Sequence, residues 1–174
     1  KRAGAVAVSD DGRPVESAKM MRDAIALAKE SGIAIISHCE DLGIIDGGII
    51  NDGEVSRTLG VKGMDRASED TITSREMILA EIQNAPIHIA HVSTKGSAEL
   101  IRQAKQRGVK VTAETAPHYL MLSDKKLLEL DADYRMNPPL RCDDDIAAMI
   151  EAVRDGTIDV IATDHAPHTP EEKS

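Results

Sequence analysis

The sequence predicts an α/β fold in which helices cover a parallel β-sheet. Short apolar runs alternate with amphipathic segments in the order β-α-β-α-β-α-β-α-β. The runs are apolar on both faces, which is typical of strands in a parallel sheet covered by helices. No linker, fixed-period repeat or low-complexity tract interrupts this order, so we expect residues 1–174 to form a single structural unit.

Local signals predict the individual elements. Residues 3–9 form a small apolar run that ends in an Asp-Asp-Gly turn signal, which predicts a buried strand. Residues 17–31 place apolar side chains on one stripe at helical spacing, and Gly32 supplies a stop. The same criteria predict strands at 33–37, 86–92, 109–115 and 158–163 and helices at 68–84, 95–107, 124–130 and 146–153.

Two segments do not fit the alternation. The connection after residue 41 is long and rich in glycine as far as Gly63, which favours a functional loop over a simple link. Residues 135–141, RMNPPLR, are expected to be irregular because paired prolines exclude both a helix and a central strand.

Composition excludes several classes of function. The chain has 30 acidic against 21 basic residues and a net charge of −9, which argues against a nucleic-acid partner. No apolar run approaches the roughly 20 residues that span a bilayer, and no signal peptide is apparent. Cys39 and Cys142 form no disulfide framework. We therefore expect no membrane partner and a reducing, cytoplasmic location.

Polar residues stand at the ends of the predicted strands: Asp11, His38, His91, Glu114 and Asp164. Strands of a parallel α/β fold end at one edge of the sheet, where binding and catalytic groups lie. Two carboxylates and two imidazoles at one edge could form a binuclear metal site. Each of these residues taken alone could also be an ordinary turn or loop residue. Spacing alone therefore leaves open both a metal site and a set of unrelated polar loop residues.

The neighbouring polar residues are interpreted by strand alternation. His88 has the opposite parity from His91, so it is expected to face the helices. His165 alternates away from Asp164 and is expected to support the site without reacting. Glu114 fits an ion pair as well as it fits a site residue.

Five motifs in order resemble the dihydroorotases, in the branch of the amidohydrolase superfamily related to hydantoinases and allantoinases. They are SHCED at 37–41, IHIAHVSTKGSAELIR at 87–102, TAETAPHYL at 112–120, RMNPPLR at 135–141 and IATDHAPHT at 161–169. The resemblance runs across essentially the whole chain. Each motif is modest evidence, but five in the same order are highly specific.

The resemblance implies the C-terminal five or so βα units of a (β/α)8 TIM barrel of the metal-dependent hydrolase type, with strands like the fourth to eighth. Relatives carry a His-x-His on their first strand, and the six histidines here include no such pair. A complete barrel also needs about 250 residues. We therefore expect a fragment that lacks the His-x-His part and is inactive by itself.

The resemblance also implies a site with two zinc ions. Its metal ligands would be Asp11, with Asp10 as the alternative, together with His38, His91 and Asp164. The aspartate after the first strand would bridge the two ions, and Asp164 would also act as general acid and base. Many relatives bridge with a carboxylated lysine, and no lysine stands here. That difference weakens the hydantoinase interpretation.

The implied reaction is the reversible zinc-dependent ring closure of N-carbamoyl-L-aspartate to L-dihydroorotate in pyrimidine biosynthesis. Asn137 and His168 would hold the ring and carboxylate of this small-molecule substrate. One alternative is the same chemistry on another ring, as in hydantoinase or allantoinase. Another is a catalytically silent dihydroorotase-like chain that assembles with aspartate transcarbamoylase. A homo-oligomer is expected if the sheet has open apolar edges.

Overall fold

Five parallel strands form the central sheet of the computed structural model, which describes residues 1–173. They are β1 (Ala7–Ser9), β2 (Ala34–Ser37), β5 (Ile87–Ile89), β6 (Val111–Thr115) and β7 (Val160–Ile161). Their order in the sheet is β1-β2-β5-β6-β7, and every neighbouring pair is parallel. Because this order follows the chain without a reversal, the sheet is an arc of a barrel and differs from a doubly wound sheet.

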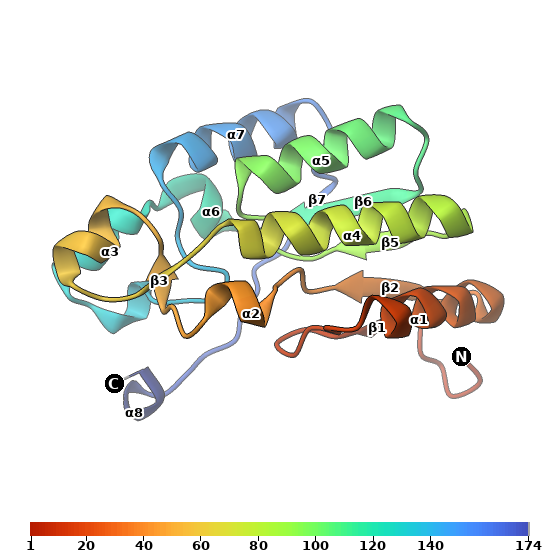
Figure 1. Cartoon of the computed structure of the whole chain (residues 1–174), viewed down its shortest axis with the longest axis horizontal. Helices are drawn as coiled ribbons and strands as arrows, with labels where there is room; N and C mark the ends of the chain where they lie inside the picture. Colours follow the sequence, from red (N-terminus) through yellow and green to blue (C-terminus); the bar gives the residue numbers. More distant parts are fainter. Residues whose placement is uncertain (174) are drawn as a thin grey trace.

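Four long helices lie in one layer against one face of this sheet (Figure 1). They are α1 (Ala18–Ser31), α4 (Ala67–Gln83), α5 (Lys95–Gln106) and α7 (Asp143–Arg154). Their apolar stripes meet the sheet in one buried core, in which Ile25, Met77 and Ile101 join Ile87 and Ile89. The predicted α/β architecture is confirmed.

Local sequence explains where the helices begin and end. The Ser17 side chain accepts a hydrogen bond from the backbone N–H of Met20 at the start of α1, and Gly32 ends the helix at φ 64°. Thr94 caps α5 in the same way by accepting from the N–H of Ser97. These caps satisfy backbone groups that a helix end leaves without intrahelical partners.

The glycine-rich connection is more structured than a loop. It contains α2 (Leu42–Ile45), β3 (Ile50–Asn51), α3 (Glu54–Leu59) and β4 (Gly63–Met64), and β3 and β4 pair in a small parallel sheet. A Cβ on Gly63 would lie 2.4 Å from the Cα of Asp52, so this close approach requires glycine.

The remaining short elements follow β6 and β7. They are α6 (Pro117–Met121), the 3₁₀ helices η1 (Asp124–Glu129) and η2 (Ala132–Tyr134), and α8 (Pro170–Lys173). Residues 135–141 contain no helix or strand, as predicted. The helix predicted at 124–130 is a 3₁₀ helix. Among the described residues, no helix is both long and apolar enough to cross a membrane.

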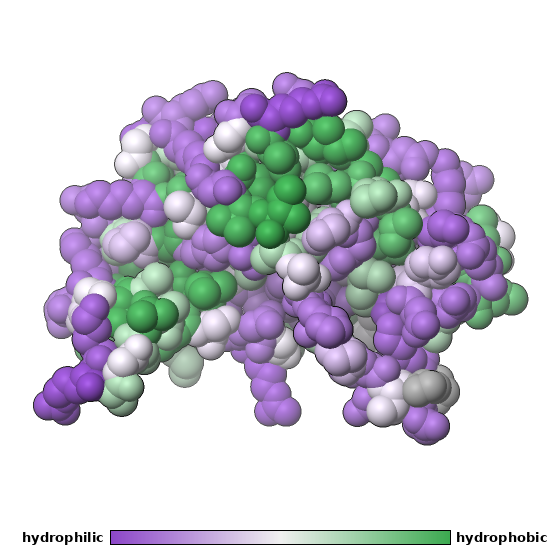
Figure 2. Space-filling model, turned by 180° about the vertical axis from the view of Figure 1, so that it is seen from behind, coloured by the Kyte–Doolittle hydropathy of each residue, from purple (hydrophilic) through white to green (hydrophobic). Residues whose placement is uncertain are grey.

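The prediction that residues 3–9 form a buried strand is wrong, because β1 is largely exposed, and β7 is exposed as well. Val8, Val160 and Ile161 are 47%, 46% and 51% exposed. Figure 2 shows hydrophobic side chains at the surface on the side opposite the helix layer of Figure 1. Val160 is exposed because every crossover returns on the same side, so all four helices cover one face and leave the other bare. Val8 and Ile161 pair in register with Ile35 and Thr115 on the helix-covered face, and they are exposed because β1 and β7 are the edge strands.

Candidate metal centre and active-site cavity

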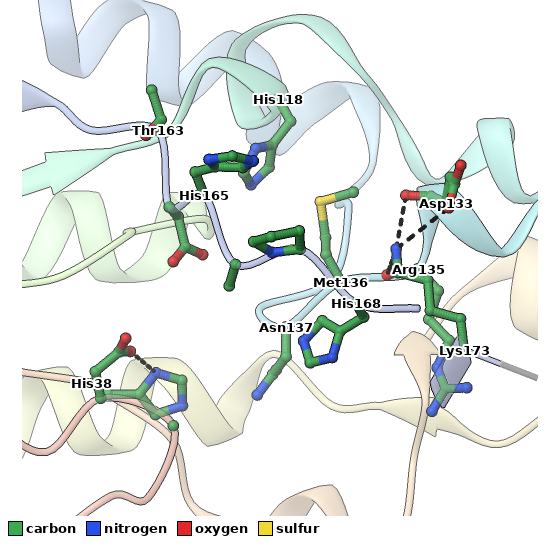
Figure 3. A pocket seen from close by; sticks show the side chains of 15 residues that line it. His38, His118, Asp133, Arg135, Met136, Asn137, Thr163, His165, His168 and Lys173 are labelled. Carbon is green, nitrogen blue, oxygen red and sulfur yellow. Dashed lines mark hydrogen bonds and ion pairs between the residues drawn. The ribbon is translucent and has the colours of Figure 1, made fainter. Parts of the chain in front are cut away.

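A cavity of about 650 Å³ opens at the carboxyl ends of the strands. Strands β2 and β5 point toward the side where α2, α3, α6 and α8 lie (Figure 1). The cavity is lined by Asp11, Gly12, His38, His118, Asp133, Arg135, Met136, Asn137, Thr163, Asp164, His165, Ala166, Pro167, His168 and Lys173 (Figure 3). Ligand sites of α/β barrels form at this end of the sheet.

Three of the predicted metal ligands converge at this end of the sheet. Asp11 Oδ1 lies 3.2 Å from His91 Nε2 and 3.4 Å from His38 Nδ1. The two imidazole nitrogens, His38 Nδ1 and His91 Nε2, are 2.8 Å apart. Among the residues that the structure describes, Asp11, His38 and His91 are the one group of three or more potential ligands whose atoms lie within 4.8 Å of one another.

The backbone around β1 and β2 decides which aspartate joins this group. Asp10 accepts hydrogen bonds from the backbone N–H of His38 at 2.8 Å and of Val15 at 2.9 Å. Both oxygens of the Asp10 carboxylate therefore accept backbone hydrogen bonds, and these bonds hold the loop after β1 beside the end of β2. Asp11 presents its carboxylate to the two imidazoles, so the geometry favours Asp11 over Asp10 as the ligand.

His91 reaches the cluster because it lies beyond the end of its strand. It follows β5 by two residues and has a left-handed backbone conformation, with φ 35°. An imidazole at such a position no longer obeys strand alternation. A non-glycine residue held in this conformation is uncommon and often marks a functional site.

The prediction that His88 faces the helices is wrong. Ile87 and Ile89 occupy the helix-covered face, so His88 between them lies on the bare face. There its ring nitrogens meet Thr112 Oγ1 at 2.8 Å and Glu114 Oε2 at 3.1 Å. Glu114 lies inside β6, not after it, and of its two predicted roles the structure shows the pairing with histidine.

The cluster is electrostatically suited to a cation. The hydrogen bond from His91 and the charges of the two imidazoles lower the pKa of Asp11, outweighing its partial burial. Burial opposes the charged form of His91, yet the bond to Asp11 and the charges of Asp164 and Asp11 raise its pKa. The site therefore attracts positive charge, and a bound metal ion would supply that charge in place of a proton.

The donor set also fits a metal ion chemically. His38 Nε2 lies 3.1 Å from Glu40 Oε2, and an ionised carboxylate only accepts hydrogen bonds. His38 therefore carries its proton on Nε2 and directs the Nδ1 lone pair at the cluster. Two imidazole nitrogens and a carboxylate oxygen are ligands that zinc and other first-row ions use.

Asp164 lines the cavity but lies outside the three-residue cluster. It is half-buried in the segment after β7 and has a φ of 49°. The charge of its carboxylate contributes to the raised pKa of His91. Its predicted roles as metal ligand and proton carrier remain predictions.

Asn137 and His168 line the same cavity from two different segments (Figure 3). Asn137 Nδ2 donates to Glu40 Oε1 at 2.8 Å. His168 is exposed, with Nδ1 3.5 Å from Glu172 Oε2. His165 also lines the cavity, because the chain after β7 is not a strand and alternation does not apply to it.

Sequence reasoning assigned no role to two further residues at this site. Glu40 contacts both His38 and Asn137 and is 9% exposed. His118 lines the cavity from α6, and its buried Nε2 has no hydrogen-bond partner within residues 1–173. Burial lowers the pKa of His118, which favours the neutral ring. Glu40 belongs to the segment SHCED and His118 to TAETAPHYL. Each follows the end of its strand by three residues, and this position was the one sequence feature that could have indicated a site role.

An arc of a parallel α/β barrel, with imidazole and carboxylate groups at its carboxyl edge that could hold a metal ion, is the arrangement expected of the amidohydrolase class. A family model described as dihydro-orotase-like matches residues 1–97, more than half of the chain. The chain therefore belongs to the dihydroorotase-like family.

Curated relatives extend the match beyond this range. A dihydroorotase of Geobacter sulfurreducens is 58% identical over 173 residues, covering 99% of this chain and 41% of that protein. A dihydroorotase of Acetivibrio thermocellus is 53% identical over 174 residues, covering 100% of this chain and 41% of the relative. The chain thus spans about two fifths of the length of the curated relatives it matches.

Solved structures agree on the fold. The D-hydantoinase (dihydropyrimidinase) from Thermus sp. aligns with a TM-score of 0.75 and 26% identity. The alignment covers 95% of this chain and 38% of that one. A cyclic-amide hydrolase fold therefore accommodates nearly all of the chain.

Proposed function

We propose that the protein acts as a dihydroorotase, catalysing the reversible ring closure of N-carbamoyl-L-aspartate to L-dihydroorotate in de novo pyrimidine biosynthesis. One observation carries the proposal. Asp11, His38 and His91 converge at the carboxyl edge, next to the cavity that Asp164, Asn137 and His168 line. The 58% identity to a curated dihydroorotase supports this choice of substrate.

The proposed metal is zinc, with two ions in the working site. Asp11, His38 and His91 would hold one ion, and Asp164 with the bridging Asp11 would contribute to the other. Bound zinc would lower the pKa of water and offset negative charge on the substrate carbonyl oxygen. The cluster supports the first ion directly, since its ligand atoms lie within 4.8 Å of one another.

The protein's own residues would position the substrate and move the proton. In the hydrolytic direction, water oxygen bonds to the ring amide carbon and the ring carbon–nitrogen bond breaks. Asp164 would accept a proton from the water and deliver it to the departing nitrogen, which yields N-carbamoyl-L-aspartate. Asn137 and His168 would bind the ring and its carboxylate. Ring closure consumes a proton, so acidic pH should favour it.

A segment exchange tests this proposal directly. Residues 1–174 would replace the matching segment of the Geobacter sulfurreducens relative, and the purified hybrid would be assayed for dihydroorotate hydrolysis with zinc. We expect turnover, and we expect Asp164→Asn to reduce kcat by about 100-fold to 10,000-fold. Asp144→Asn is the matched control, because the Asp144 side chain is 80% exposed and outside the cavity. A folded, zinc-loaded hybrid without turnover would overturn the proposal.

The same hybrid separates the proposed function from its alternatives. Hydantoin and allantoin would be tested beside dihydroorotate, since a D-hydantoinase structure shares the fold at 26% identity. A higher kcat/KM on hydantoin would favour the alternative ring substrate. A hybrid that binds aspartate transcarbamoylase but turns over none of these rings would favour the silent assembly partner.

The organisation of the protein adds further proposals. We propose that the five strands correspond to the fourth to eighth of a (β/α)8 barrel within a single domain over residues 1–174, of which Ser174 lies outside the described residues. Val160 is exposed on the bare sheet face, and Val8 and Ile161 are exposed on the edge strands β1 and β7, which supports self-association or binding of aspartate transcarbamoylase. Light scattering of the chain with and without that enzyme tests both. The free Cys39 and Cys142 support a cytoplasmic location.

A further inference from the structure

We propose that Glu40 is a positioning residue that joins the metal centre to the substrate-binding segment. Its carboxylate connects His38, a ligand of the cluster, with Asn137, a proposed substrate contact. The inference rests on the proposed function, because it assigns a role to a residue beside that same site.

The geometry consists of two hydrogen bonds on opposite oxygens of one carboxylate. Glu40 Oε2 lies 3.1 Å from His38 Nε2, and Glu40 Oε1 accepts from Asn137 Nδ2 at 2.8 Å. Glu40 is 9% exposed, so both bonds form largely away from water. The chain His38–Glu40–Asn137 therefore links the end of β2 to the irregular segment 135–141, although Asn137 follows Glu40 by 97 residues.

The bond to His38 determines what the cluster can bind. With the proton on Nε2 held by Glu40, the Nδ1 lone pair faces Asp11 and His91. A carboxylate behind a metal-binding imidazole fixes its tautomer and orientation and makes it a better ligand.

The bond to Asn137 determines what that amide offers the substrate. Because Nδ2 donates to Glu40, the carbonyl oxygen of the Asn137 side chain remains as the free acceptor. Asn137 lines the cavity, where that oxygen can accept a ring N–H (Figure 3). Glu40 thus orients two groups: it leaves the Nδ1 lone pair of His38 facing the metal cluster and the side-chain oxygen of Asn137 free to accept from the substrate.

A purely structural role does not account for this pattern. The buried Glu69 accepts from the backbone N–H groups of Ser93 and Thr94, as expected of a residue that stabilises a loop. Both hydrogen bonds found for the Glu40 side chain end instead on side chains of the site. A carboxylate also accepts hydrogen bonds on both of its oxygens, whereas a glutamine accepts on one side and only donates on the other.

The test measures cobalt(II) binding to the 174-residue chain by absorption spectroscopy and calorimetry. Glu40→Gln can accept from only one of its two partners, so we expect about 10-fold to 100-fold weaker binding and an altered cobalt spectrum. The double variant Glu40→Gln/Asn137→Asp exchanges donor and acceptor. In it, the new carboxylate at position 137 can accept from the new amide at position 40, whose carbonyl oxygen still accepts from His38. We expect the double variant to recover affinity to within a few-fold of the unmodified chain.

Glu114→Gln is the matched control, because Glu114 also meets a histidine at 3.1 Å but lies outside the cluster. We expect it to bind cobalt like the unmodified chain. If Glu40→Gln binds normally while the unmodified chain binds cobalt, the inference is overturned and the proposed metal site stands. If the unmodified chain binds no cobalt, the proposed metal site and this inference both fail. Failure of the exchange to restore affinity in a folded double variant would also contradict the inference.

Discussion

The two main polar clusters of the molecule differ in how completely their charges are satisfied. Glu69, 4% exposed, accepts hydrogen bonds from Ser93, Thr94 and Arg141. Arg141, also 4% exposed, donates to Ser93 Oγ at 3.0 Å and to Asn51 Oδ1 at 3.2 Å. The negative charge of Glu69 is therefore paired within the network with the positive charge of Arg141.

The cluster of Asp11, His38 and His91 lacks an internal cation of this kind. It places two imidazole nitrogens 2.8 Å apart beside a carboxylate oxygen, and within residues 1–173 the hydrogen bonds and ion pairs of these three side chains join them to one another and to Glu40, not to a lysine or arginine. A proton or a metal ion must therefore come from outside. A buried network whose charges are paired stabilises the loops, whereas a cluster at the strand ends without such a partner is available for binding.

The largest expected loss of stability comes from a substitution that disrupts the buried network of Glu69 and Arg141. Glu69→Gln leaves the Arg141 guanidinium buried without its 3.3 Å carboxylate partner. We expect a loss of about 3–5 kcal/mol in the free energy of unfolding, measured by urea denaturation. Glu81→Gln, in the exposed pair with Arg107, should cost only about 0–1 kcal/mol. Equal losses in the two variants would show that burial does not distinguish the pairs.

The next effect concerns the unsatisfied cluster. Zinc at about 100 times its Kd should raise the free energy of unfolding by about 2.7 kcal/mol, because it binds only the folded chain. We expect His91→Ala to abolish this increase in thermal unfolding experiments. His88→Ala should retain it, since His88 pairs with Glu114 on the bare face. Loss of the zinc effect in both variants would contradict the assignment of the cluster.

Acid should act on the satisfied network in a defined direction. Burial alone would raise the pKa of Glu69, but the Arg141 charge and the Ser93 and Thr94 donors outweigh it and lower the pKa from 4.5. Its contribution is therefore fully present above pH 4.5 and is lost as the pH falls through the folded-state value. Each unit of depression corresponds to about 1.4 kcal/mol.

The pH effect is measured as a difference between two proteins. Asp70 and Glu76 have pKa values raised by burial, so their contributions run in the opposite direction and would obscure that of Glu69 in the wild-type profile. Subtracting the Glu69→Gln profile isolates Glu69. A difference that stays constant from about pH 6 to about pH 3 would refute the assignment.

The smallest effect is confined to one helix of the scaffold. Ser17→Ala removes the side chain that accepts from the Met20 N–H at the start of α1. We expect a loss of about 1 kcal/mol by urea denaturation, with zinc affinity unchanged. Ser17→Asp retains an acceptor and should keep most of the stability. A change in zinc affinity would mean that the scaffold and the cluster are coupled.

Local sequence was sufficient for the elements that carry their own signals. The stripe of residues 17–31 with its stop at Gly32 predicted α1, and the apolar runs located all five strands of the sheet. The polar residues at the strand ends predicted the edge where Asp11, His38 and His91 meet. These features depend on periodicity and on the common direction of parallel strands, which neighbouring residues determine.

Tertiary structure decided the features that depend on distant residues or on irregular backbone. His88 lies on the bare face although alternation from His91 placed it against the helices, because φ at His91 is 35° and alternation no longer holds there. The bond between Glu40 and Asn137 joins residues 97 apart in the sequence, which no local pattern could reveal. The sequence alone predicted that Asp11, His38 and His91 gather at the edge of the sheet. Only packing determined which atoms face one another there and brought Glu40 and His118 to the same site, because side-chain direction after a strand is set by long-range contacts.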